Sequence, residues 1–254
     1  MQLRDWIATM ERIAPPELAM EWDNPGLLVS PEREKLTTVL VALDCTVPVA
    51  EEAAAVGAQL VLTHHPVLFG GTKRVLRDDP ETAAIYRLIR HGIGLYAAHT
   101  NLDAAPGGVN DALAARLGLC EIRPLPPENL GRVGLLPQAL PLQAFAAAVE
   151  RALGCTALAT GDAARPVHTV ALIGGAGGSD VAAAAAAGAD VFVTGECKHH
   201  QALEAQMRGM AVLTCGHYET ERVGLETLIA RLQGPENDVQ YLVAHAETSP
   251  QRRF

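Results

Sequence analysis

Short runs of β-branched and aliphatic residues alternate with helical segments along this chain, and this alternation restricts the fold more than any other feature. The first such runs are Thr37–Leu43, Gln59–Leu62 and Ile93–Ala97. A helical segment follows each of them, with proline near its start or glycine just past its end. Strands that alternate with helices form largely parallel sheets whose faces the helices cover. We therefore expect the α/β class.

A second α/β succession follows a proline-rich stretch. Three of the four residues 124–127 are prolines, which favours an extended linker there. Beyond it, predicted strands and helices alternate again, from a strand at Arg132–Leu136 to a last strand at Val239–Val243. We expect two lobes with mainly parallel sheets, residues 1–124 and 128–254. The C-terminal part of the second lobe is expected to pack back on the first.

Composition and charge narrow the class of protein. With 254 residues, 49% of them hydrophobic, the chain can bury a large core. Its net charge of −9 argues against a broad nucleic-acid-binding surface. The longest apolar stretch, Val181–Ala189, is too short to span a membrane, so no membrane partner is expected. The five cysteines are scattered without a C-x-x-C pair, which is typical of a reducing compartment, and we expect a cytoplasmic protein.

Two adjacent histidines, His64 and His65, stand where the strand Gln59–Leu62 ends. Pro66 cannot donate a backbone hydrogen bond, so strand pairing stops there. In open α/β sheets, ligands bind beyond this end of the strands. Because neighbouring side chains of an extended segment point different ways, the two imidazoles could serve two separate centres. The alternative is a pair of ordinary polar loop residues.

Other polar residues also follow predicted strands. Histidine and carboxylate side chains dominate this set, and such mixed nitrogen and oxygen ligands suit Zn, Mn, Fe, Co or Ni. His217 and Glu221 are four residues apart and would share one face of a helix. The groups that follow the later strands are His99 with Asp103, Lys198 with His200, and His217 with Glu221.

Each of these residues also has a structural interpretation. Glu221 could be an acid favoured by the helix dipole, and Asp103 could be a turn former before a glycine pair. Cys215 and His217 together could form a mononuclear site, although a cysteine at a strand end is more often packed in the core. The segment Gly174–Gly178 resembles an anion-binding loop but lacks the lysine of a P-loop.

A series of short motifs covers most of the chain. In order, the motifs are Trp22–Leu27, Ala42–Asp44, Thr63–Pro66, His99–Asp103, Gly107–Asp111, Gly174–Gly175, Thr194–Glu196 with Lys198 and His200, and Gly216–His217 with Glu221. Each motif alone is modest, but taken together and in this order they resemble the Nif-three-like family, some members of which are named GTP cyclohydrolase type two homologues and which includes YbgI-like proteins.

This resemblance implies two intertwined α/β/α lobes that hold two divalent transition-metal ions per chain, in a ring-shaped homohexamer built as a trimer of dimers. His65 and Asp103 would hold one ion, His64 and His217 the other, and Glu221 would bridge both. The positions of His99 and His200 are better suited to facing the substrate or supporting the ligands. A further imidazole, His199, leaves open which of the residues 199 and 200 faces the site.

Two classes of function agree with such a centre. The first is a metal-dependent hydrolase that acts on a small-molecule nucleotide or phosphoester, with His99 or His200 accepting a proton from water. The second is a non-catalytic protein that stores or delivers metal, or a scaffold held together by its ions. Neither the metal nor the substrate follows from the residues alone.

Overall fold

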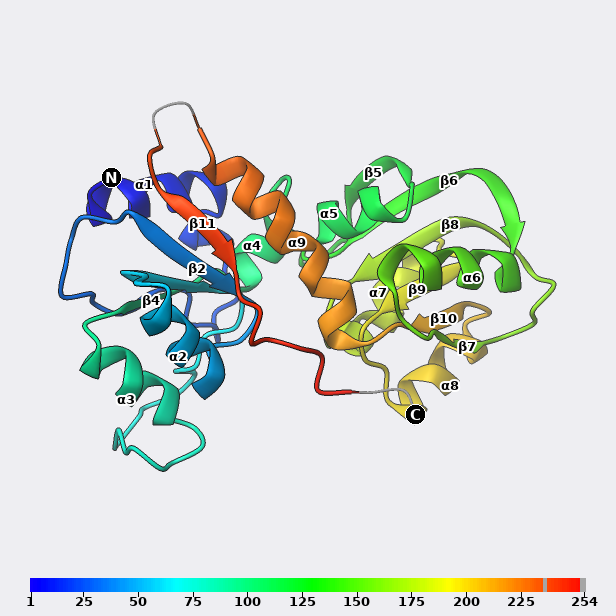
Figure 1. The fold of residues 1–254 in the computed structure, drawn as a ribbon. Coiled ribbons are helices and arrows are strands. Elements are labelled where there is room, and N and C mark those ends of the chain that lie inside the picture. Colours follow the sequence, from blue (N-terminus) through cyan, green and yellow to red (C-terminus); the bar gives the residue numbers. More distant parts are fainter. Residues whose placement is uncertain (235–236, 252–254) are drawn as a thin grey trace. The chain divides into compact units, whose positions relative to one another are not determined.

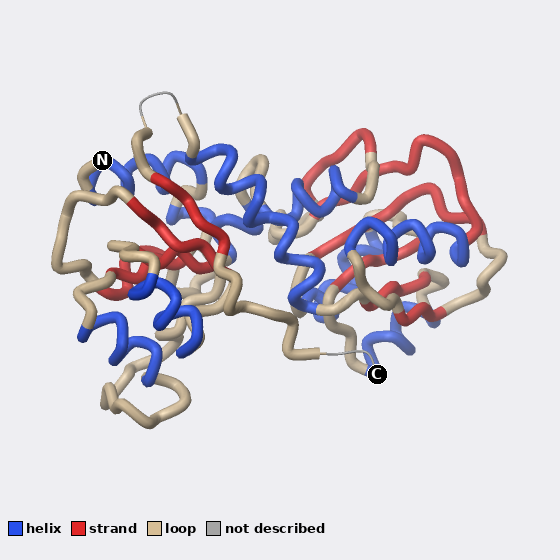
Figure 2. The backbone as a smooth tube through the Cα atoms, viewed as in Figure 1, coloured by secondary structure: helices blue, strands red, loops and turns tan. Residues whose placement is uncertain are grey.

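The computed structural model describes residues 1–234 and 237–251, which form two compact units. The first unit contains Met1–Ala105 and Leu228–Pro250, and the second contains Pro106–Thr227. The chain thus leaves the first unit after Ala105 and returns to it at Leu228. In each unit helices cover a sheet (Figures 1 and 2), which confirms the α/β class. Among the described residues, no helix is both long and apolar enough to cross a membrane.

A five-stranded sheet forms the centre of the first unit, in the order β1-β4-β3-β2-β11. Only β1 runs antiparallel to its neighbour; the other pairs are parallel. The strands are β1 (Gly26–Val29), β2 (Thr38–Ala42), β3 (Leu60–Thr63), β4 (Gly94–Ala97) and β11 (Gln240–Val243). The helices are α1 (Leu3–Ile13), the 3-10 turn η1 (Pro16–Leu18), α2 (Val47–Ala55), α3 (Ala83–Arg90) and α4 (Thr100–Ala104).

A separate group of side chains packs on each face of this sheet. Leu40 and Val61 pack with α2 and α3 in one apolar cluster. On α1, Trp6 is fully buried, packs edge-on against Tyr96 at 5.2 Å and donates its indole N–H to Tyr241 Oη at 2.9 Å. Trp6 therefore joins the first helix to a central strand and to the last strand, which is more than two hundred residues away along the chain.

The second unit has a six-stranded sheet in the order β5-β6-β8-β9-β10-β7. Its centre, β8-β9-β10, is parallel, and the outer pairs are antiparallel. The strands are β5 (Cys120–Pro124), β6 (Arg132–Pro141), β7 (Leu158–Thr160), β8 (Pro166–Ile173), β9 (Val191–Thr194) and β10 (Ala211–Thr214). The helices are α5 (Val109–Arg116), α6 (Leu142–Leu153), the 3-10 turn η2 (Gly177–Asp180), α7 (Val181–Ala186), α8 (His199–Met207) and α9 (His217–Leu232), whose last turn belongs to the first unit.

Alternating side chains of β8 build two cores on opposite faces of this sheet. Val170 and Leu172 pack with α5 and α6, whereas Ala171 and Ile173 pack with α7 and α8. This is the pattern of a strand buried on both faces. The proline-rich stretch that suggested a linker joins β5 to β6 within the sheet, and the units divide between Ala105 and Pro106.

The two tryptophans provide a matched test of the packing. We expect Trp6→Ala to lower the free energy of unfolding by about 3–5 kcal/mol, because it empties a fully buried site. Trp22→Ala, at a side chain that is 58% exposed, should cost less than about 1 kcal/mol. Urea unfolding of both variants checks this, and equal losses would show that Trp6 does not support the core as described.

Candidate metal centre

His64 and His65 directly follow β3, and the backbone holds both in place. His64 N donates to Ala42 O at 3.2 Å and His65 N to Leu43 O at 2.9 Å, so pairing with β2 continues past the strand end. His99 follows the neighbouring strand β4 in the same way. Parallel neighbours thereby bring three imidazoles to one edge of the sheet, as the sequence analysis expected for strand ends.

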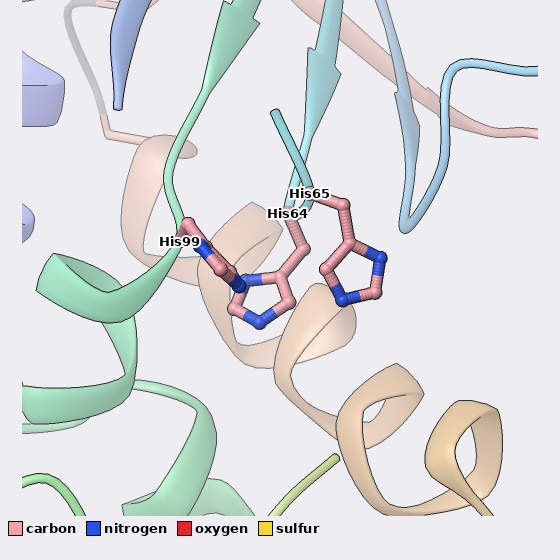
Figure 3. Close-up of side chains that lie close together, drawn as sticks. All are labelled: His64, His65 and His99. Atoms are coloured by element: carbon pink, nitrogen blue, oxygen red, sulfur yellow. The ribbon is translucent and has the colours of Figure 1, made fainter. Parts of the chain in front are cut away.

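The three imidazoles form one group of candidate ligands (Figure 3). One ring nitrogen from each of His64, His65 and His99 lies within 4.8 Å of the others. The ring centroids are 5.0 to 5.4 Å apart. The group lies wholly within the first unit and could hold a metal ion. The His99 ring therefore lies close enough to His64 and His65 to be a candidate ligand itself.

Each ring in this group uses its Nδ1 atom for a hydrogen bond within the protein. His64 Nδ1 lies 2.8 Å from the carbonyl oxygen of Ala98, which can only accept, so this nitrogen carries the proton. His65 Nδ1 lies 2.9 Å from Asp44 Oδ1, and His99 Nδ1 lies 2.8 Å from Asp23 Oδ1. In the neutral rings Nε2 then carries the lone pair that could ligate an ion, the arrangement seen in histidines that ligate metals.

Asp23 is held in its ionised form. Burial raises the pKa of this carboxyl group, but hydrogen bonds from His99 and Thr100 outweigh burial and lower the pKa to about 2. Thr100 donates both its backbone N–H, at 3.0 Å, and its hydroxyl, at 2.5 Å. A fixed negative charge thus stands behind the His99 ring at neutral pH.

Asp103 lies beside His64 in the first unit. It belongs to the short helix α4, its side chain is largely buried, and its Oδ1 is 3.5 Å from His64 Nε2. The backbone N–H of Asp103 donates to His99 O at 3.0 Å, so this helix begins directly at the imidazole group. The expected turn after β4 is therefore helical, and it places a carboxylate next to a nitrogen of a candidate ligand.

His217 and Glu221 form a second donor pair, within the second unit. Helix α9 begins at His217, and its first turn brings His217 Nε2 to 3.1 Å from Glu221 Oε2. His217 Nδ1 lies 2.8 Å from Glu196 Oε1, which repeats the pattern of the first unit. The expectation that residues 217 and 221 share a helix face is confirmed.

The glycine-rich segment after β8 leaves space for this pair, and its backbone N–H groups donate to protein side chains rather than to an anion. The backbone N–H groups of Gly174, Gly175 and Gly177 donate to Asn110, Thr220 and Thr194 at 2.9 to 3.0 Å. Gly175 has a φ of +63°, and a Cβ built on it would lie 2.0 Å from Glu221 Oε1 and 3.0 Å from His217 Nε2. Glycine at position 175 is thus what leaves room for the donor pair.

The remaining candidates fall outside these donor sets. His199 and His200 are both exposed at the start of α8, and Lys198 precedes them. Cys215 is buried in the core of its unit; its hydrogen bond with Cys155, together with burial, raises the pKa of the Cys215 thiol. Cys215 is therefore a core residue, in agreement with the packing interpretation of a cysteine at a strand end.

Sequence reasoning missed the carboxylates that orient the imidazoles, Asp23, Asp44 and Glu196. All three lie in the motifs quoted above, Asp44 directly after a predicted strand and Glu196 after another. Acids at such positions are common turn residues, and the sequence offers no sign of which histidine each would contact.

Comparison with known proteins establishes the family. A family model described as Duf34/NIF3 (NGG1p interacting factor 3) matches residues 1–250. A Clostridium perfringens protein named GTP cyclohydrolase 1 type 2 homolog is 33% identical over 98% of both chains. The chain belongs to the DUF34/NIF3 family, as its motifs indicated.

Solved structures have the same fold. A Staphylococcus aureus hypothetical protein is 30% identical, with a TM-score of 0.92 over 100% of this chain and 99% of its own. A Bacillus cereus protein related to NIF3 has a TM-score of 0.93 over the same shares at 24% identity, and this second likeness concerns the fold alone.

Gly175→Ala tests the role of the glycine segment. We expect it to weaken divalent-ion binding at least about ten-fold, because the new methyl group displaces Glu221 and His217. Gly154→Ala is the matched control: its φ is +68° and nothing lies within 4 Å of a new Cβ, so it imposes similar backbone strain without the clash. Isothermal titration with Mn²⁺ compares the two, and equal affinities would contradict the steric role.

Proposed function

We propose that the chain is a dinuclear metal-dependent hydrolase that acts on a nucleotide or another phosphoester. In this proposal His65 and Asp103 hold one ion, His64 and His217 hold the other, and Glu221 bridges both. The family resemblance supports this pairing, since it assigns the same five residues to one centre.

The observation that carries the proposal is the orientation of the imidazoles. Four histidines, two of them adjacent in sequence, each turn Nδ1 toward a protein oxygen, so that in the neutral ring Nε2 is the nitrogen that carries the lone pair. Histidines that ligate metals almost always donate their other ring N–H to a carboxylate or a backbone carbonyl oxygen, which is the arrangement found here. A donor set of imidazole nitrogens and carboxylate oxygens fits Zn, Mn, Fe, Co or Ni.

Bound divalent ions would supply Lewis acidity, which activates water and stabilises charge that develops on the substrate. The protein supplies the proton acceptor. His99 donates a hydrogen bond from Nδ1–H to Asp23, and its Nε2 can accept a proton from water. Because Asp23 stays ionised, it stabilises the imidazolium that results. His200 is a second proposed acceptor, from the exposed start of α8.

The relatives' names suggest the reaction without fixing it. Several relatives are named GTP cyclohydrolase 1 type 2 homolog, a name that points to hydrolysis of a purine ring. The scattered cysteines and the negative net charge further support a cytoplasmic protein that acts on a small molecule.

A non-catalytic metal-storage, metal-delivery or scaffold protein is the second candidate function, and the position of His99 favours it. A ring nitrogen of His99 lies among the candidate ligand atoms of His64 and His65. If His99 binds an ion, it fills a coordination position that a hydrolase keeps open. His99→Ala separates the two: the hydrolase keeps its metal and loses turnover, whereas the other candidate loses metal.

Metal analysis tests the proposed centre. We expect the purified protein to hold about two transition-metal ions per chain. Glu221→Ala should remove most of both, because it is the proposed bridge, and His64→Ala should empty one centre more than the other. Full occupancy in Glu221→Ala would contradict the bridging role.

Turnover is measured beside metal content. A screen of metal-loaded protein across nucleotides and phosphoesters should find hydrolysis that Glu221→Ala lowers at least about a hundred-fold. Metal-loaded protein that turns over none of these substrates would favour the second candidate.

Assembly provides an independent check on the family expectation. We expect sizing with light scattering to give a species of about six chains, the trimer of dimers proposed for this family. A monomer at micromolar concentration would contradict the ring.

A further inference from the structure

Two exposed aromatic side chains stand next to the imidazole group. Trp22 is 58% exposed and Phe69 is 51% exposed, and in the described part of the chain they are the only aromatic rings among the exposed large hydrophobic side chains. By contrast, Trp6, Phe145 and Phe192 are almost completely buried. Exposed aromatic rings lack the stabilisation that burial provides. An exposed pair beside a candidate site therefore suggests that a ligand covers it.

The two rings form one surface with His99. Trp22 and Phe69 stack on each other, with centroids 6.3 Å apart and planes inclined by 25°. Both meet the His99 ring edge-on, at 5.9 and 5.6 Å. Because the rings already contact each other, a further flat ring adds to an exposed face and does not insert between them.

Hydrogen bonds hold both loops that carry these rings in position. Asp23, next to Trp22, accepts hydrogen bonds from Thr100 and lies against His99 Nδ1. Asn24 Nδ2 donates to Leu68 O at 2.5 Å, which ties the loop of Trp22 to the residue before Phe69. The rings are therefore exposed yet held in position, which lowers the entropy cost of binding a ligand on them.

We propose that Trp22 and Phe69 form an aromatic platform that binds the planar heteroaromatic ring of the substrate. This rests on the proposed function: the platform takes the base of a nucleotide while its phosphate end reaches the imidazole group and the ions. The π-face of any base stacks on Trp or Phe, so the platform recognises a ring without selecting one base. It assigns the substrate class as nucleotides rather than aliphatic phosphoesters.

Trp22 is itself the reporter for the test. The chain has two tryptophans, and Trp6 is fully buried against Tyr96 and Tyr241, so ligand-dependent quenching reports Trp22. The as-purified full chain is titrated with adenosine monophosphate, guanosine monophosphate and, as the ring-free control, ribose 5-phosphate. We expect saturable quenching by both nucleotides, with affinity at least about ten-fold above that of ribose 5-phosphate. Equal affinity for ribose 5-phosphate, or no quenching by either nucleotide, overturns the proposal.

Variants locate the binding face. Phe69→Leu should weaken nucleotide binding about ten-fold in the same titration, whereas Ile89→Ala, at an exposed side chain of the same unit, should leave it unchanged. Calorimetry extends the comparison to the reporter position, where Trp22→Leu should lose affinity and Trp22→Tyr should keep most of it. Equal affinities in wild type, Phe69→Leu and Trp22→Leu overturn the platform, and the thermal melting of each variant shows that it is folded.

Failure of the platform and failure of the proposed function are separable. The titrations need no turnover, so they decide the platform even in a protein without hydrolase activity. In a hydrolase, Trp22→Leu should raise KM for a nucleotide about ten-fold and change kcat less than about two-fold. Unchanged KM in an active, metal-loaded Trp22→Leu overturns the platform and leaves the metal centre standing.

Discussion

The hydrogen bond between His64 Nδ1 and the carbonyl oxygen of Ala98 decides which imidazole nitrogen is available to an ion. A carbonyl oxygen has no proton to give, so the bond fixes the tautomer as well as the direction of the ring. His64 is buried, which prevents the ring from turning toward water instead. His64 is thus oriented by a backbone carbonyl group, whereas Asp44 and Asp23 orient His65 and His99.

The pairing of β3 with β4 brings His64 and the carbonyl group of Ala98 together. In the parallel pair β3-β4, Thr63 lies opposite Ala97, and Ala98 N donates to Thr63 O at 2.9 Å. This register carries on beyond the strands, so the residue after Thr63 meets the carbonyl group of Ala98. His99, one residue further, then joins the same group of rings. Backbone pairing, set by buried apolar residues, thus positions polar side chains that could not fix their own geometry.

Much of this arrangement could be predicted from sequence, because apolar periodicity and helix end signals are local. The strands that precede His64 and His99 were located within about two residues. The short helix α4 and the edge strand β5 were missed. Every residue of β5 is exposed, so the strand has no buried apolar face, and Glu121 within it has a positive φ of 51°.

The orienting carboxylates could not be predicted for a different reason. Asp23 reaches His99 across more than seventy residues of chain, and only the folded register of β4 brings the two together. The role of Gly175 likewise follows from the space that Glu221 needs, which no local pattern shows. Local sequence predicts which segments carry the candidate ligands, whereas tertiary contacts decide how their side chains are oriented.

The most direct test of this account is the protonation of the His64 ring in metal-free protein. Long-range ¹H–¹⁵N correlation spectra of histidine side chains distinguish a protonated Nδ1 from a protonated Nε2. The account predicts that neutral His64 carries its proton on Nδ1, with Nε2 unprotonated, and that adding Zn²⁺ shifts the Nε2 resonance. A His64 ring with its proton on Nε2, and no change in that resonance with Zn²⁺, would contradict it.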